Sequence, residues 1–311
     1  MSKPHDSLEN IEETIEAMKQ NLLNLVPGDD LPSFMAPFIC PDVIGHEDVK
    51  LGVLCCLASQ WDTDDMRQRI HILMKGVKGT GKTMFINYLT RKWGALYLSG
   101  EAKRSSLKGD GRKDDGGVRL LTKYHGGIVC HDEIEGFKDI DTLRDVLEDG
   151  TYTDTRGGKH EVFPAQCRYV AAANDISKVS GPILSRFDLI YSFEVPTVDE
   201  SIAIVRKKIA GINFPDTIDD TIRAYITVSR SIEPVLTAES EEELDAKTEP
   251  FVEYFQSIEE GRSGRWVDSV LRLATSLARL RLSDTITARD IQEALEMRLC
   301  SDAALEEPYY D

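Results

Sequence analysis

The stretch Gly76–Thr83, GVKGTGKT, decides the fold that we predict for this chain of 311 residues. It fits the pattern G-x-x-x-x-G-K-[ST] and lies between an apolar stretch at 71–76 and a helical pattern at 82–93. Glycines there let backbone N–H groups turn toward phosphate oxygens, and the following helix N-terminus adds partial positive charge. A glycine-rich turn without function is the alternative. The residues expected to bind phosphate are Gly76, Val77, Lys78, Gly79, Thr80, Gly81, Lys82 and Thr83.

Two side chains of this loop and two acids further along predict hydrolysis of ATP with Mg²⁺. Lys82 would reach the β- and γ-phosphates, and Thr83 would ligate the metal ion. The stretch GGIVCHDE then puts Asp132 and Glu133 at the end of an apolar strand, where Asp132 would complete the metal site. Glu133 can polarise an attacking water, which indicates hydrolysis and not binding alone. A chance acid pair is the alternative, and His131 is interpreted as a packed or hydrogen-bonded bystander.

A polar residue and an arginine near two later strands are further candidates. The predicted strand within CRYVAAAND ends in Asn174, where an amide can hold the lytic water or sense the γ-phosphate. A turn-capping asparagine is the alternative. Arg186 lies just before the next strand and can face the nucleotide of a neighbouring subunit, where it would stabilise transition-state charge. Taken alone, it would be interpreted as a surface residue.

Apolar stretches alternate with helical patterns through the first two thirds of the chain. This alternation predicts an α/β fold with a parallel sheet that is covered by helices on both faces. The expected strands lie at 71–76, 95–100, 126–133, 167–175 and 186–195.

Past residue 197 the pattern predicts helices only, forming a small bundle. The acidic run at 239–250 is interpreted as a solvated helix start or loop, with an acidic interaction site as the lesser alternative. Thr287 and Asp290 have the spacing of a capping box at the start of the last helix. We therefore expect an N-terminal helical extension at 1–37, an α/β ATPase domain at 38–197 and a helical lid at 198–311. Helical patterns follow residue 197 at 198–211, 219–232, 266–283 and 286–300.

The composition argues against a membrane span, a signal peptide and a zinc site. No apolar run approaches the roughly 18 residues of a membrane span, and the N-terminus lacks the apolar core of a signal peptide. The six cysteines have no zinc-like spacing, so we expect free thiols in a cytoplasmic or nuclear protein. The net charge of −17 repels nucleic acid, so any DNA contact needs locally placed basic residues.

The motifs together resemble AAA+ ATPases and, more narrowly, the minichromosome maintenance (MCM) replicative helicases. ILSRFDLIYSFEVPTVDES at 183–201 is close to the arginine-finger block of that family and is the most specific element. The stretch at 143–174 is similar to its Walker B to sensor block, in which a β-hairpin precedes the sensor strand. The stretch at 41–57 resembles the block ahead of the loop, and 269–295 resembles the C-terminal helical subdomain. The resemblance covers roughly 38–300.

The resemblance implies further roles, carried over only where residues match. Lys82 and Thr83 take the Walker A roles, Asp132 and Glu133 the Walker B roles, Asn174 is sensor 1 and Arg186 is the arginine finger. Arg265 matches the sensor-2 arginine. The hairpin would present Arg156 and Lys159 to DNA in the central channel of a ring, hexameric by resemblance, and an exposed turn with solvating charges is the alternative.

Three departures from the family pattern are visible. Only some 40 residues precede the resemblance, where the family has a large DNA-binding region. The loop ends GKT, where the family usually has alanine before the lysine and serine after it. The insert at 103–117 is short and basic, and is interpreted either as a second DNA-touching loop or as a solvated loop; its cations are Lys103, Arg104, Lys108, Arg112 and Lys113.

Two classes of function stay open from the sequence. The first is a ring-forming, ATP-driven DNA translocase or helicase core, favoured by the SRFDLI block and the hairpin cations. The second is an AAA+ remodelling or regulatory ATPase that acts on protein partners, as MoxR- and chelatase-like relatives do, favoured by the acidic charge. A piece of a longer helicase is a third interpretation.

Overall fold

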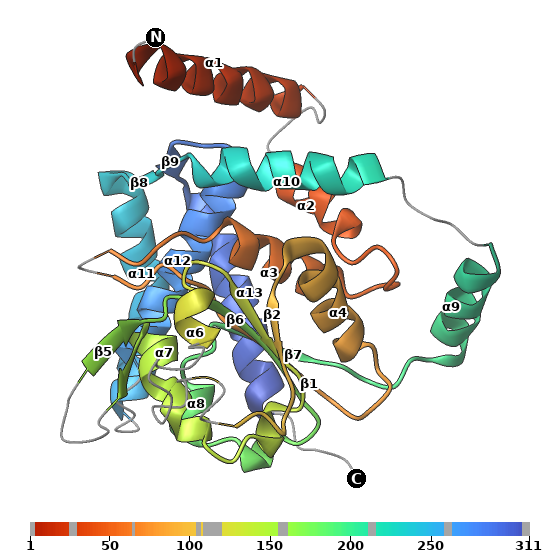
Figure 1. Ribbon diagram of the computed structural model, residues 1–311. Coiled ribbons are helices and arrows are strands. Elements are labelled where there is room, and N and C mark those ends of the chain that lie inside the picture. The colour runs from red at the N-terminus through yellow and green to blue at the C-terminus, as the bar shows by residue number, and fades with distance from the viewer. Residues whose placement is uncertain are drawn as a thin grey trace.

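A five-stranded parallel sheet forms the centre of the molecule (Figure 1). The computed structural model describes residues 4–24, 30–63, 66–103, 107, 120–154, 161–210, 216–257 and 263–306. The strand order is β2-β3-β6-β1-β7, and every neighbouring pair is parallel. All five strands predicted from the apolar stretches are present, so the α/β prediction is confirmed. They are β1 (Ile72–Lys75), β2 (Leu96–Leu98), β3 (Ile128–His131), β6 (Arg168–Ala173) and β7 (Leu189–Ser192).

Alternation of side chains along the strands divides the core into two layers. Ile72 and Met74 of β1 face one buried cluster, together with helices from both ends of the chain. Leu73, between them, faces a second cluster on the other side of the sheet. Because both faces are covered, the strands are continuous apolar runs, as the sequence pattern predicted. The first cluster includes residues on both sides of position 197, so the C-terminal helices share this core.

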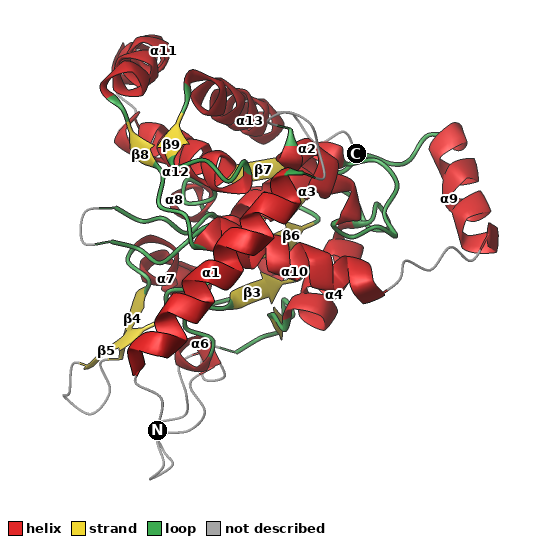
Figure 2. Ribbon diagram, turned by 90° about the horizontal axis from the view of Figure 1, so that it is seen from above, coloured by secondary structure: helices red, strands yellow, loops and turns green. Residues whose placement is uncertain are grey.

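Helices cover both faces of the sheet (Figures 1 and 2). Helix α1 lies beside α10, and α9 stands away from the sheet in both views. The α-helices are α1 (Pro4–Leu23), α2 (Leu31–Met35), α3 (Glu47–Ala58), α4 (Lys82–Trp93), α6 (Leu120–Lys123), α7 (Arg144–Glu148), α8 (Gly181–Leu184), α9 (Val198–Ala210), α10 (Asp216–Arg230), α11 (Ala238–Ser257), α12 (Ser263–Leu280) and α13 (Ala288–Glu306). Short 3₁₀ turns lie at Ala36–Phe38, Ile134–Gly136, Ile140–Leu143 and Ile176–Lys178.

The C-terminal third follows the sequence pattern with two differences. The expectation of helices only was wrong, because β8 (Val235–Leu236) and β9 (Thr285–Ile286) form a short parallel pair. The acidic run lies within the 20-residue helix α11, which buries Leu244 and Thr248, so only part of the run is solvated. The capping box is present: the Thr287 N–H donates to the Asp290 carboxylate at 2.8 Å, and the Asp290 N–H donates to the Thr287 hydroxyl at 3.4 Å.

A second, two-stranded sheet projects from the body. Strands β4 (Thr151–Asp154) and β5 (Glu161–Pro164) pair antiparallel, which confirms the hairpin before the sensor strand. The buried Tyr152 ring stacks on Phe163 at 5.3 Å between centroids and anchors this hairpin to the core. Arg156 and Lys159 lie outside the described residues, as do all of the basic insert's cations except Lys103.

Two general features complete the fold. All six cysteines are free thiols, five of them buried, with Cys300 exposed. Within the described part of the chain, no helix combines the length and apolarity that crossing a membrane requires.

Candidate active site

The glycine-rich loop connects β1 to the N-terminus of α4. Gly81 has φ 107° at the N-cap of α4, and Gly76 has φ 143°, so both occupy backbone conformations that other residues rarely adopt. A Cβ atom on Gly76 would also lie 2.1 Å from the Phe193 carbonyl oxygen of the neighbouring segment. These two glycines are therefore required for the chain to turn from strand into helix here.

The Lys82 side chain folds back over this loop. Its ammonium donates to the carbonyl oxygens of Gly76 at 2.5 Å and Val77 at 2.8 Å. Burial lowers the pKa of Lys82, and the nearby carboxylates of Asp132 and Glu135 oppose that shift. The lysine is therefore held at the loop, as a cation that binds phosphate must be.

Thr83 and Asp132 lie together, as the sequence predicted. The Thr83 hydroxyl donates to the Asp132 carboxylate at 3.2 Å. Neighbouring ligands of an octahedral Mg²⁺ lie about 2.9 Å apart when each is about 2.1 Å from the ion. The hydroxyl and carboxylate oxygens thus fit two adjacent positions of such a metal ion.

Glu133 and Asn174 also meet, from the ends of two neighbouring strands. The Asn174 amide nitrogen lies 3.4 Å from the Glu133 carboxylate, and Glu133 itself has a left-handed backbone with φ 53°. The Lys78 ammonium forms an ion pair with the same carboxylate at 3.0 Å. Through this hydrogen bond and its charge, Lys78 lowers the pKa of Glu133 and keeps the carboxylate ionised.

Lys78 and Glu135 are two residues of this region whose contacts the sequence did not predict. Lys78 was expected only as part of the phosphate loop. The Glu135 carboxylate accepts the Asn174 backbone N–H at 2.8 Å and fixes the end of β6. Its only signal in the sequence was its place two residues after Glu133. His131 is buried and hydrogen bonds to the Tyr169 hydroxyl at 2.7 Å, so it is the packed bystander that we predicted.

A cavity of about 690 Å³ adjoins the phosphate loop. Its walls come from the segment before α3, from the loop itself, and from the segment that leads into α9. His46 lines it and stacks on Phe193 at 4.4 Å between ring centroids. This volume falls within the range of small-molecule sites.

Arg186 lies at the opposite end of the sheet from this loop. It precedes β7, whereas the loop follows β1, and these two strands are parallel neighbours with Ile72 opposite Leu189. The chain advances five positions from His71, which lies beside Asp188, to Gly76, and this span covers about 16.5 Å at 3.3 Å per residue. An arginine side chain cannot cover that distance, so Arg186 does not reach the phosphate loop of its own chain.

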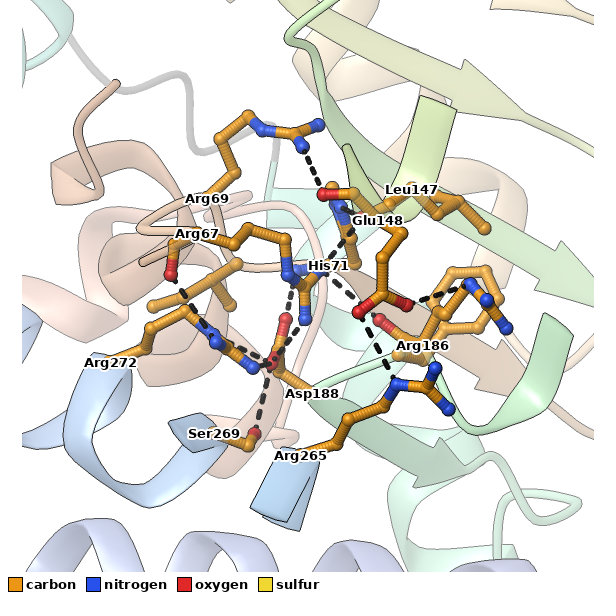
Figure 3. Close-up of polar contacts among 12 residues, drawn as sticks. Arg67, Arg69, His71, Leu147, Glu148, Arg186, Asp188, Arg265, Ser269 and Arg272 are labelled. Atoms are coloured by element: carbon orange, nitrogen blue, oxygen red, sulfur yellow. Dashed lines mark hydrogen bonds and ion pairs between the residues drawn. The ribbon is translucent and has the colours of Figure 1, made fainter. Parts of the chain in front are cut away.

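Arg186 and Arg265 share one carboxylate, that of Glu148 (Figure 3). Arg186 Nε lies 3.0 Å from Glu148 Oε2, and Arg265 Nε lies 3.3 Å from Oε1. Only 8% of the Arg186 side chain is exposed, against 44% for Arg265, and Arg186 also donates to the Pro182 carbonyl. The structure thus brings together the two arginines that the sequence had marked separately. The sequence did not mark Glu148, although an acid in the last turn of a helix is unfavourable without a cationic partner.

A buried ion cluster fixes the backbone around these arginines (Figure 3). The Asp188 carboxylate accepts from Arg67 at 3.0 Å, from Arg272 at 2.8 Å and from the His71 N–H at 2.8 Å. Burial alone would raise the pKa of Asp188, but Arg272 and Arg67 outweigh it and hold that pKa well below its usual range. This aspartate therefore stays ionised and ties β7 to α12, the helix that carries Arg265.

The same cluster occupies the carbonyl groups at the end of α7. The Leu147 carbonyl accepts from Arg67 at 3.2 Å and from His71 Nε2 at 3.0 Å. The Tyr169 N–H donates to the other ring nitrogen of His71, so the imidazole is neutral with its proton on Nε2. Burial and the nearby Arg67 and Arg69 charges lower the pKa of His71, which agrees with this state. Arg69 donates to the carbonyl oxygens of Val146 and Glu148, and Glu148 is thereby fixed in position.

The fold and the convergence of loop, acids and asparagine at the strand ends define a P-loop ATPase domain of the AAA+ type. Comparison with protein families then gives the narrower assignment. Residues 18–209 match the MCM P-loop domain, and residues 220–301 match the MCM AAA-lid domain. The chain belongs to the MCM family, as the resemblance in its sequence had indicated.

Individual relatives are distant in sequence. The chain is 26% identical to DNA replication licensing factor mcm7-B of Xenopus laevis, over 94% of this chain and 46% of that protein. It is 26% identical to an uncharacterised MCM-type protein of Methanocaldococcus jannaschii, over 100% of this chain and 47% of that one. It is 25% identical to DNA replication licensing factor MCM5 of Arabidopsis thaliana, over 95% of this chain and 49% of that one. The chain spans about half the length of the curated relatives that it matches.

Proposed function

We propose that this MCM-type domain hydrolyses ATP with Mg²⁺ at sites shared between neighbouring subunits of a ring, and that hydrolysis drives movement along DNA. The observation that carries the proposal is the division of the candidate residues between the two ends of one parallel sheet. The phosphate loop, Asp132, Glu133 and Asn174 lie at one end, and Arg186 with Arg265 lies at the other. A ring in which subunits pack head to tail joins one end to the other.

In this proposal each residue has one role. Lys82 and the loop N–H groups bind the phosphates, and Thr83 with Asp132 holds Mg²⁺, which bridges phosphate oxygens and neutralises their charge. Glu133 accepts a proton from the attacking water, which Asn174 orients. Arg186 and Arg265 of the neighbouring subunit stabilise the charge on the transferred phosphoryl group.

DNA is the proposed polymer because of the family and the hairpin. Two of the relatives are named as DNA replication licensing factors. Strands β4 and β5 project a hairpin whose connecting residues include Arg156 and Lys159. With a net charge of −17, the chain needs such local cations to bind a polyanion. A remodelling ATPase of the MoxR or chelatase type is not favoured, because both parts of the chain match MCM domains.

The ATPase proposal is tested by Lys82→Ala. We expect hydrolysis to fall by at least about a hundredfold, since an electrostatic group at the phosphates is lost. Arg91→Ala is the matched control, because it removes an exposed cation from the same helix. Hydrolysis by Lys82→Ala at the parent rate would contradict the proposal.

The DNA proposal is tested by measuring ATP hydrolysis and binding with single-stranded DNA over a salt series. We expect stimulation and binding at low salt, with affinity falling linearly in the logarithm of salt concentration. Replacing both Arg156 and Lys159 by alanine should reduce that salt dependence by about two phosphate contacts per subunit. Neither binding nor stimulation at low salt would contradict the DNA proposal and leave the ATPase proposal intact.

A further inference from the structure

Glu148 is the only acid that contacts both Arg186 and Arg265 among the residues that the structure describes (Figure 3). We propose that Glu148 is a positioning residue, which holds these two arginines as one unit that reaches the nucleotide of a neighbouring subunit. This inference rests on the proposed function, since it assigns the pair to the shared site. It concerns a residue that itself touches no nucleotide in that proposal.

Two guanidinium groups from separate elements would repel each other without a shared counter-ion. Arg186 follows α8, and Arg265 lies near the start of α12, 79 positions further along the chain. One carboxylate oxygen contacts each Nε, so a single negative charge lies beside both cations. The trio keeps a net charge of about +1 at neutral pH, because only one of the two positive charges is neutralised. It can therefore bind phosphate while its members stay together.

Burial makes Arg186 depend on this counter-ion. Arg186 is 8% exposed, and its pKa is lowered by burial, with Glu148 the largest opposing influence. A buried cation without a counter-ion is costly, so an Arg186 side chain that lost Glu148 would turn toward solvent. Arg265 is more exposed and has more conformational freedom to lose, so its direction also depends on this contact.

The backbone that carries the Glu148 side chain is fixed by hydrogen bonds from two arginines. Arg69 donates to the Glu148 carbonyl oxygen at 3.1 Å. Arg67 donates both to the Leu147 carbonyl at 3.2 Å and to the Arg186 carbonyl at 3.3 Å. The Arg67 guanidinium thus links the backbone next to Glu148 to the backbone of Arg186. An incidental surface ion pair would not have its backbone fixed on both sides by hydrogen bonds in this way.

The test compares Glu148→Gln with Asp145→Asn, which removes one negative charge from an exposed position one turn earlier on α7. Glutamine keeps the shape and cannot pair with two cations. We expect kcat to fall about 10- to 100-fold, as for a displaced catalytic group, while KM for ATP stays within about twofold. Asp145→Asn should leave both within about twofold, and Glu148→Asp should recover part of the lost rate.

A double substitution separates positioning from a general structural role. In a chain that already carries both Arg186→Ala and Arg265→Ala, Glu148→Gln should lower the residual kcat by no more than about twofold further, because its effect acts through those two arginines. A full additional loss in that background would overturn the inference, as would an unchanged kcat in Glu148→Gln alone. A KM that rises as much as kcat falls would also overturn it.

A measurement without activity keeps this inference distinct from the proposed function. Heteronuclear NMR of the guanidinium Nε–H groups, assigned with Arg186→Lys and Arg265→Lys, reports whether each group stays protected from solvent, as the buried Arg186 Nε is in the parent. We expect slow solvent exchange for Arg186 Nε–H in the parent and fast exchange in Glu148→Gln, with unchanged backbone signals elsewhere. If hydrolysis depends on Lys82 but Glu148→Gln is fully active, only the positioning role fails. If no Lys82-dependent hydrolysis exists, the proposed function fails, and unchanged Nε–H exchange would overturn the pairing as well.

Discussion

The two ends of the central sheet differ in how their polar residues are satisfied. At the phosphate-loop end, Glu133 and Lys78 are exposed, and Thr83 and Asp132 make a single contact with each other. At the other end, Asp188 is buried and accepts from several donors, and the carbonyl groups at the end of α7 are all occupied. The phosphate-loop end therefore leaves charges available for a ligand. The opposite end holds its side chains in place by contacts within the chain.

This difference indicates that the two ends of the sheet contribute unequally to stability and to activity. Paired buried charges are costly to disrupt, whereas exposed charges contribute little to folding. We therefore expect substitutions at the loop end to affect catalysis with little effect on stability. Substitutions in the buried cluster should unfold the chain or disorder the arginines.

The largest expected effect is on catalysis at the loop end. Glu133→Gln should lower kcat by about 10²- to 10⁴-fold, because the group that accepts the proton is lost, while ATP still binds. Chemical denaturation should show a free energy of unfolding within about 0.5 kcal/mol of the parent, since the side chain is largely exposed. Glu253→Gln, on an exposed face of α11, is the control. A destabilised or fully active Glu133→Gln would contradict the expectation that substitutions at the loop end reduce catalysis and leave stability unchanged.

The next effect is on stability at the opposite end. Asp188→Asn should lower the free energy of unfolding by about 3–5 kcal/mol, because the buried Arg272 and the partly buried Arg67 lose their counter-ion. Asp132→Asn is the matched substitution at the loop end, and we expect it to abolish Mg²⁺-dependent hydrolysis with little change in stability. Equal stabilities of the two variants in urea denaturation would contradict the division that we describe.

A smaller effect concerns the pH dependence of stability. Burial lowers the pKa of His71, and it lowers that of His131 to about 4. Both imidazoles stay neutral in the folded chain, whereas the unfolded chain takes up protons below its ordinary pKa near 6.5. The free energy of unfolding should therefore fall as the pH drops below about 6.5, by up to about 1.4 kcal/mol per pH unit for each histidine.

Denaturation at pH 7, 6 and 5 measures this slope. His131→Gln should reduce it by about one proton's contribution, because glutamine does not titrate. An identical slope in the parent and in His131→Gln would show that His131 is not held neutral in the folded chain.

The smallest expected effect is a shift in the pKa of Glu133 at the loop end. Lys78 lowers the pKa of Glu133, so Lys78→Met should raise it and move the acid limb of the pH–rate profile to higher pH, with little change in rate at pH 7. The shift should be less than about one unit, since both groups are exposed to solvent. Lys178→Met, which removes an exposed cation paired with Asp175, is the control. A shift to lower pH would contradict the contact between Lys78 and Glu133.

The sequence predicted the loop end in more detail than the arginine end, and the reason is physical. The loop, Asp132 and Asn174 each lie at the end of a strand, and parallel strands bring such ends to one edge. The contacts of Glu148 depend instead on where the start of α12 lies relative to the end of α7, which no local pattern specifies. Arg69 and Asp188 were also missed, because a sequence pattern does not distinguish a buried charged residue from an exposed one. The β8–β9 pair was missed because two residues are too short to show a period.

The central claim is that one active site is built from two subunits, and mixing tests it most directly. Arg186→Ala keeps the loop end intact, and Glu133→Gln keeps the arginine end intact, so each variant alone should retain only a small residual activity. In equal mixture, about a quarter of head-to-tail interfaces would combine both intact ends, and activity should recover in that proportion. A chain with both substitutions, mixed with Arg186→Ala, should show no recovery. If light scattering shows mixed assemblies and no activity returns, the shared site is contradicted.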